Sequence, residues 1–245
     1  MSIENILLFL GTFIAIITFF TRNRNKFLDT SLNLVLGLLI CSIEIYRIIH
    51  FGLVPFYKVF DIILIIVILL ITKNILIKIN SIKYSNLLHA FIVLLLLVAI
   101  FLPSKYKQPS HLPPILNSIF FYIHVPLYII SYFSLFSASI GSLIYLMKRN
   151  IPDWLKKSIN IDTIMSFYLM NLGLISGAIW ADNTWGSFWS WDPKENISLA
   201  IVLLLSIYFH TKSEKSKSII IILSTMLVFF NFLLLNFIVK GLHSY

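Results

Sequence analysis

Residues 161–210, IDTIMSFYLMNLGLISGAIWADNTWGSFWSWDPKENISLAIVLLLSIYFH, carry two apolar runs joined by a tryptophan-rich connection. The runs fall at Ile161–Ile179 and Pro193–His210, and each approaches the ~20 residues that a helix needs to cross a bilayer. The connection holds four of the five tryptophans of the chain. We therefore expect two membrane helices with an aromatic cluster at one membrane surface between them.

The composition extends this expectation to the whole chain. Of its 245 residues, 59% are hydrophobic and 12% charged, and the mean hydropathy is +0.93. These values exclude a soluble fold and are typical of a polytopic membrane protein. The sequence predicts an all-α integral membrane protein of about eight transmembrane helices, forming one domain over residues 1–245 with an outer tryptophan-rich loop at 180–195. The other predicted spans are Ile3–Phe20, Ser31–Ile49, Phe56–Thr72, Asn86–Leu102, Ile119–Met147 and Ile219–Val239.

The charged residues predict the orientation of these spans. Most of the 19 lysines and arginines lie in the connections after the first, third, fifth and seventh spans, as the positive-inside rule expects of cytoplasm-type loops. Both termini and the tryptophan loop then face the outer side. The net charge of +9 is scattered and forms no basic face, so we expect membrane lipid and no nucleic acid as a partner. The first span lacks a basic leader and a small-residue cleavage site, so we expect it to be retained.

The tryptophan loop suggests a binding surface. Aromatic belts spread tryptophans over all helix ends, whereas here Trp180, Trp185, Trp189 and Trp191 gather in one connection. Such a cluster forms a flat wall for a large planar ligand, and haem fits that description. The residues Asp192, Pro193 and Glu195 predict a capping box at the start of the next helix, which would hold the wall rigid.

The histidines supply candidate iron ligands. His124 and His243 are both expected on the outer side, where two imidazoles would fill both axial positions of a haem iron. His210 lies at the other end of its span, about 26 Å from the start, so it belongs to a second site or has a structural role. A pair of His210 with His89 is geometrically allowed. His50 and His111 are expected to be solvated loop residues.

Other chemistries have little support in the sequence. Cys41 is the only cysteine, which excludes an intrachain disulfide and a CxxCH attachment site. The chain has no glycine-rich phosphate loop and no HExxH motif. Two i to i+3 pairs, Glu44 with Arg47 and Lys58 with Asp61, predict local salt bridges. A transporter or channel unrelated to haem, and a structural membrane anchor, remain open, although a transporter should carry polar residues at mid-membrane and the spans are mostly bare of them.

The pattern Trp185-Gly-x-x-Trp189-x-Trp191-Asp192 resembles the tryptophan-rich WWD signature of the haem-handling proteins of cytochrome c biogenesis. Trp189–Glu195, Tyr208-Phe-His210 and the ending Lys240-Gly-Leu-His243-Ser-Tyr245 are similar to the CcsA type of the two-component system. The resemblance runs from about His124 onward. The first half departs from it, with Gly52-Leu-Val-Pro55 in place of the usual Gly-His-Phe-Pro.

The resemblance implies a protein that delivers haem to the outer side for attachment to apocytochrome c, positioning it and not catalysing bond formation in the usual sense. It implies haem b, bound non-covalently in transit, with His124 and His243 as external axial ligands and His210 as the ligand within the membrane. A CcsB/Ccs1-type partner subunit would supply the second inner ligand. A plastid thylakoid membrane is favoured over a bacterial plasma membrane. The implied haem platform comprises Trp180, Trp185, Trp189, Trp191 and Asp192.

Overall fold

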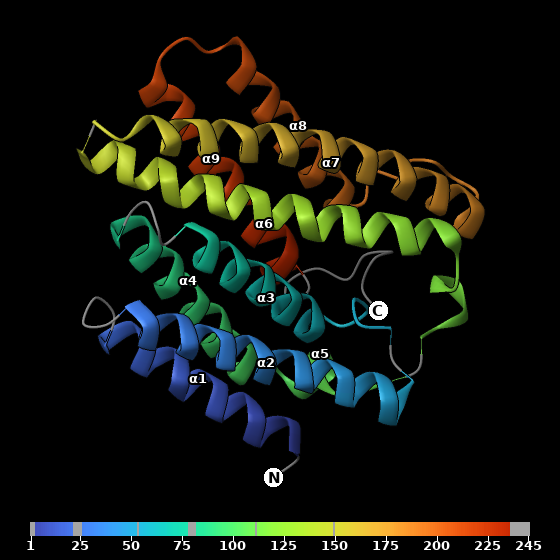
Figure 1. Cartoon of the computed structure of the whole chain (residues 1–245). Helices are drawn as coiled ribbons and strands as arrows, with labels where there is room; N and C mark the ends of the chain where they lie inside the picture. The colour runs from blue at the N-terminus through green and yellow to red at the C-terminus, as the bar shows by residue number, and fades with distance from the viewer. Residues whose placement is uncertain are drawn as a thin grey trace. The chain divides into compact units, whose positions relative to one another are not determined.

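The computed structural model describes residues 3–21, 26–52, 54–77, 82–110, 112–148 and 150–235, and these residues form helices and no strand. The all-α prediction is confirmed. The chain divides into two compact units, residues 1–113 and residues 114–245, which Figure 1 colours blue to green and green to red. The prediction of a single domain stays a prediction.

In its described residues, the first unit is a bundle of four long helices and one short one. Each long helix packs against two others: α1 and α3 both contact α2 and α4. The short helix α5 packs against α3. The bounds are α1 Ile3–Thr21, α2 Lys26–Phe51, α3 Val59–Ile77, α4 Ile82–Phe101 and α5 Ser104–Lys107.

The second unit is built on a long antiparallel pair. In Figure 1, α6 (Ile119–Lys148) and α7 (Asp153–Trp185) run side by side over most of their length. The helix α8 (Pro193–His210) packs against α7 and α9, and α9 (Glu214–Phe229) packs against α6. A 3-10 turn, η1 (Pro114–Leu116), precedes α6, and a π-helical turn, η2 (Phe230–Leu234), continues α9.

The membrane spans match the apolar runs. Seven helices in the described part of the chain are long and apolar enough to cross a membrane, which supports a polytopic membrane protein. They begin at Ile3, Phe27, Val59, Tyr84, Ile119, Asp153 and Glu214. The remaining predicted span, α8, has its expected bounds but begins with a polar turn that lowers its hydropathy.

Helix α7 is longer than its apolar run predicts. It has 33 residues and begins after Pro152, which precedes its first turn. It ends where Gly186 adopts a left-handed conformation at φ 73° and its N–H caps the Asp182 carbonyl. No proline lies between these points, so the polar flanks stay helical. Trp180 and Trp185 are thus helical, and the connection to α8 comprises only residues 186–192.

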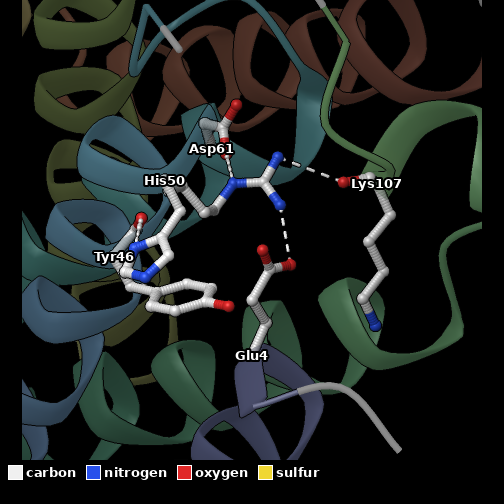
Figure 2. Close-up of polar contacts among 6 residues, drawn as sticks. Glu4, Tyr46, His50, Asp61 and Lys107 are labelled. Atoms are coloured by element: carbon white, nitrogen blue, oxygen red, sulfur yellow. Dashed lines mark hydrogen bonds and ion pairs between the residues drawn. The ribbon is translucent and has the colours of Figure 1, made fainter. Parts of the chain in front are cut away.

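A buried ion cluster joins four elements of the first unit (Figure 2). The guanidinium of Arg47 lies 2.8 Å from Glu4 of α1 and 2.7 Å from Asp61 of α3. It also donates to the Lys107 carbonyl of α5 at 3.1 Å. Arg47 is 1% exposed, and a planar fork of donors suits several acceptors at once. The cluster therefore ties α1, α2, α3 and α5 together at one end of the bundle.

The two local salt bridges predicted from sequence are wrong. Arg47 turns to carboxylates on neighbouring helices, and neither oxygen of buried Glu44 has a hydrogen-bond partner in the described part of the chain. Lys58 lies over the Tyr57 ring, 4.6 Å from its centroid, while Asp61 pairs with Arg47. Spacing along one helix does not decide a pairing when other helices pack against the same end.

At the end of the first unit opposite the Arg47 cluster, buried side chains of α2, α3 and α4 form a chain of hydrogen bonds. Asn33 bonds to Asp29, Asn74 donates to Asn33 at 3.3 Å, and Ser85 donates to Asn74 at 2.6 Å. Polar groups that face one another inside a bundle satisfy each other away from lipid. Of these residues only Asn33 lies inside a predicted span, near its start, so the prediction that the spans are mostly bare at mid-membrane stays a prediction.

Candidate haem-binding site

His124 is held against the backbone of a neighbouring helix. It lies in the second turn of α6, and its Nδ1 is 2.7 Å from the Gly173 carbonyl oxygen of α7. A carbonyl can only accept, so Nδ1 carries a proton, and in the neutral ring Nε2 then carries the lone pair. Metal-binding histidines commonly donate their other N–H in this way, which fixes the ring orientation and raises its basicity.

Two glycines make room for this contact. A Cβ built on Gly177 would lie 2.5 Å from His124 Cε1 and Nδ1, and one on Gly173 would lie 2.7 Å from the Tyr128 ring. The two rings on α6 therefore occupy the space that side chains on α7 would otherwise fill. The spacing Gly173-x-x-x-Gly177 is the small-residue signature of close helix packing in membranes. This signal was present in the sequence, but the functional role of the glycines was missed.

Aromatic rings extend the site from His124 along the end of α7. Trp180 is 2% exposed, and its ring centroid lies 6.5 Å from that of His124 at an interplanar angle of 30°. Trp185 meets Trp180 edge to face at 4.9 Å, and Phe121 lies 6.1 Å from Trp180. The structure thus brings His124, Trp180 and Trp185 together.

The connection to α8 holds the other two tryptophans. Trp189 and Trp191 meet edge to face at 6.2 Å. Trp191 is 70% exposed and has a positive φ of 59°, the only such non-glycine residue in the described part of the chain. A bulky residue rarely adopts this conformation unless its surroundings impose it. Here the Asn196 side chain donates to the Trp191 carbonyl at 2.9 Å.

The capping box predicted for α8 is confirmed and fixes the end of this connection. The Asp192 side chain accepts from the Lys194 N–H at 2.9 Å. The Glu195 side chain accepts from the Asp192 N–H at 3.1 Å and from the Ser190 N–H at 2.9 Å. Because Glu195 also accepts from Ser190, these bonds fix the backbone on both sides of Trp191. The cap of α8 thereby also holds the tryptophan connection in place.

The remaining histidines lie elsewhere or outside the described residues. His210 is exposed at the last turn of α8, at the opposite end of the helix from the tryptophan connection. His50 is exposed in the last turn of α2 and stacks on Tyr46 (Figure 2). His89 is buried in the first unit, with Nε2 2.9 Å from the Ala15 carbonyl. His243 and His111 lie outside the described residues.

The residues that are described fit a haem better than a bare metal ion. Within residues 3–235 as described, no three histidine, cysteine or acidic side chains are grouped to hold an ion. His124 instead offers one oriented imidazole nitrogen beside a tryptophan face, and haem needs few protein ligands because the porphyrin supplies the equatorial four. The C-terminal end of α9 lies at the same end of the second unit as His124. Asn231, in the turn that continues α9, donates to Ser198 in the first turns of α8 at 3.0 Å.

Comparison with known proteins identifies the family. The family model described as "Cytochrome C assembly protein" matches residues 49–244. A protein of Chlamydomonas reinhardtii named "Cytochrome c biogenesis protein CcsA" is 37% identical over 160 residues, which cover 59% of this chain and 45% of that protein. Proteins of the same name from Prochlorococcus marinus and Mesostigma viride are 30% and 31% identical, each over 59% of this chain and over 59% and 61% of their own lengths. The chain thus spans about half to three-fifths of these relatives, and it belongs to the cytochrome c assembly protein family.

Proposed function

We propose that this protein is a membrane component of cytochrome c biogenesis that binds haem at the His124 end of its second unit and presents it for attachment to apocytochrome c. The observation that carries the proposal is the His124 ring, oriented by the Gly173 carbonyl beside the face of Trp180. Family membership supports the same reading, since the relatives are named for cytochrome c biogenesis.

Each residue of the site has a positioning role. His124 would hold the haem iron through Nε2, and the Gly173 carbonyl keeps that nitrogen turned away from α7 by binding Nδ1. Buried Trp180 and half-buried Trp185 give an aromatic wall, while exposed Trp191 gives an aromatic surface open to a ligand. Haem supplies the ligated iron and the vinyl groups that react with cysteine thiols. Holding it in place is the contribution expected of this chain.

The second axial ligand in this proposal is His243. The described chain ends at Leu235, one turn beyond Asn231, whose contact with Ser198 lies at the start of α8. His243 follows this point by eight residues. The last described residue, Leu235, therefore lies near the end of the unit that holds His124 and the tryptophans, which the charge distribution predicts to be outer, and this supports His243 as the second ligand.

His210 is proposed as the ligand of a second, inner haem, completed by a histidine of a CcsB/Ccs1-type partner subunit. His89 is a poor candidate for that ligand, since its side chain is 0% exposed in the core of the first unit. The thylakoid membrane is the proposed location and a bacterial plasma membrane the alternative. The relatives come from organisms such as Chlamydomonas reinhardtii and Prochlorococcus marinus, and these sources fit both locations.

An absorption spectrum of the full-length protein, purified with its native partner, tests the proposal. We expect sharp reduced-state bands of bis-histidine haem, lost in His124→Ala and in His243→Ala and partly restored by added imidazole. His50→Ala is the matched control, because His50 is exposed and packs only on its own helix. A protein that contains no haem, or a His124→Ala spectrum equal to that of His50→Ala, would contradict the proposal and favour a transporter or channel.

A further inference from the structure

A pocket lies in the second unit at the end opposite His124. It has a volume of about 330 Å³ and lies among the end of α6, the start of α7, the end of α8 and the start of α9. Its polar lining consists of Tyr145, Lys156, Asn160, Tyr208, Glu214, Lys217 and Ser218. All of these residues belong to one unit, so the pocket is formed within a single bundle.

The pocket has an excess of positive charge. Lys156 and Lys217 line it together with one acidic residue, Glu214. Lys217 lies 2.9 Å from Glu214, and Lys156 lies 3.2 Å from Asp153. The carboxylates of these two pairs are 58% and 98% exposed, and such pairs contribute little to stability. Both ammonium groups can therefore turn from their partners toward a bound anion.

Uncharged donors complete the lining. The Tyr208 hydroxyl donates to the Asn160 side-chain oxygen at 2.9 Å, which leaves the Asn160 amide N–H groups as donors. The Lys217 ammonium lies 5.6 Å from the Tyr208 ring centroid, and Ser218 adds a hydroxyl at a position 5% exposed. The helices α7 and α9 both begin here, with the positive ends of their dipoles. Ammonium, amide and hydroxyl donors together suit a tetrahedral oxyanion.

The surroundings of the pocket favour an oxyanion that carries hydrocarbon. Ile151, Ile159 and Ile221 line it beside the polar groups. The connections at this end of the unit are the basic ones, which the positive-inside rule assigns to the inner leaflet. Basic pockets between membrane helices on that side are typical sites for anionic lipid head groups.

We propose that this pocket binds the phosphate group of an anionic phospholipid of the inner leaflet. The proposal is independent of haem binding. His210 follows Tyr208 by two residues, about 200° around the helix, so it lies on the other face of α8 from the pocket. Free phosphate shares the recognition chemistry, and the experiment separates the two sources.

Native mass spectrometry of the full-length protein in detergent tests the proposal, with phosphatidylglycerol, phosphatidylcholine and inorganic phosphate as separate probes. We expect phosphatidylglycerol adducts at least tenfold more abundant than phosphatidylcholine adducts, with no displacement by millimolar phosphate. The double variant Lys156→Gln/Lys217→Gln should lose this preference, and Lys156→Arg/Lys217→Arg should retain it. The matched control is Lys157→Gln/Lys215→Gln, which removes two neighbouring charges outside the pocket lining.

Three outcomes would overturn the proposal. Equal loss in the control and in the pocket variant would show general attraction to a basic surface. Phosphate that raises the melting temperature and removes the adduct would identify soluble phosphate as the ligand. Equal binding of both lipids by the unaltered protein would show no anion recognition. Tyr208→Phe provides a second variant without charge change, and we expect it to weaken the preference by removing the bond that orients Asn160.

Discussion

At Gly177 the main chain of α7 comes so close to His124 that a methyl group has no room. The added Cβ would lie 2.5 Å from two atoms of the imidazole ring, well inside van der Waals contact. One of these two atoms, Nδ1, also bonds to the Gly173 carbonyl of the same helix, so the ring is already held against α7. An alanine at position 177 must therefore displace the ring or separate the helices, and either movement changes where Nε2 points.

We predict that Gly177→Ala lowers haem occupancy at least tenfold while the protein still inserts in the membrane. The matched control is Gly141→Ala, whose Cβ would lie 2.5 Å from Ile159 across the same pair of helices but away from His124. Overpacking of this kind costs about 1–3 kcal/mol, so both variants should lose stability. Reduced-state absorption and thermal unfolding measure the two effects, and equal haem loss in both variants would contradict a positioning role for Gly177.

Trp191 shows a conflict between backbone preference and side-chain placement. Its φ of 59° costs a residue with a side chain about 1–2 kcal/mol, whereas glycine adopts it freely. Its side chain is 70% exposed, so the protein gains little by burying it. The structure therefore bears a local cost at a residue that presents an exposed indole ring, as a residue proposed to contact a ligand would.

We predict that Trp191→Gly leaves the haem-free protein as stable as before or more stable by about 1 kcal/mol, and lowers haem retention. Thermal unfolding of the haem-free form gives the first quantity, and the haem remaining after gel filtration gives the second. Should haem retention stay unchanged, Trp191 is an interfacial anchor and not part of the platform.

At the scale of elements, the start of α8 decides the geometry of the tryptophan connection. Only residues 186–192 join α7 to α8, and both ends are fixed: Gly186 caps α7, and the capping box of Asp192 and Glu195 starts α8. The Glu195 carboxylate also accepts from Ser190. The cap therefore shapes the connection as well as stabilising the helix.

We predict that Asp192→Ala costs about 1 kcal/mol of stability and also weakens haem binding, while Asp192→Asn, which keeps a side-chain acceptor, does neither. Ser213→Ala is the control, since Ser213 caps α9 at the other end of the unit. It should lower stability without affecting haem. Denaturation and haem titration on the three variants check this, and a haem affinity that falls equally in Ser213→Ala would assign the effect to lost stability alone.

The elements were largely predictable, while the contacts between them were not. Apolar runs and the Asp192 cap depend on neighbouring residues and can be seen in one segment of sequence. The ends of α7 were missed because its polar flanks lie outside the apolar core that hydropathy detects. Arg47 was paired with Glu44 on its own helix, because its partner Glu4 lies 43 residues away and spacing along one helix cannot reveal it. His124 was found by its chemistry, but Gly173 was not, because a backbone carbonyl gives no signal in the sequence.

At the scale of the whole molecule, each unit has its own polar interior. In the first unit, Arg47 balances two buried carboxylates, and Glu4 and Asp61 are each less than 9% exposed. Breaking a buried ion cluster by removing one partner leaves the others uncompensated, which is far more costly than removing all of them. The residues of the proposed haem site all belong to the second unit.

We predict that Arg47→Met destabilises the protein by about 3–5 kcal/mol, because it leaves Glu4 and Asp61 facing each other without a cation. The triple variant Arg47→Met/Glu4→Gln/Asp61→Asn should recover most of this loss. Chemical denaturation in detergent measures both. A triple variant less stable than the single one would show that the cluster acts through hydrogen-bond geometry and not through charge balance.

The tryptophans and the cysteine of the chain lie in different units. All five tryptophans lie within residues 114–245, while Cys41, the only cysteine, lies within residues 1–113 and is partly buried in α2. Indole fluorescence therefore reports on one unit, and the rate of thiol alkylation reports on the other, in the unlabelled wild-type protein. Haem quenches nearby indole emission by energy transfer. Haem binding should therefore lower the tryptophan fluorescence of the protein without changing the rate at which Cys41 is alkylated.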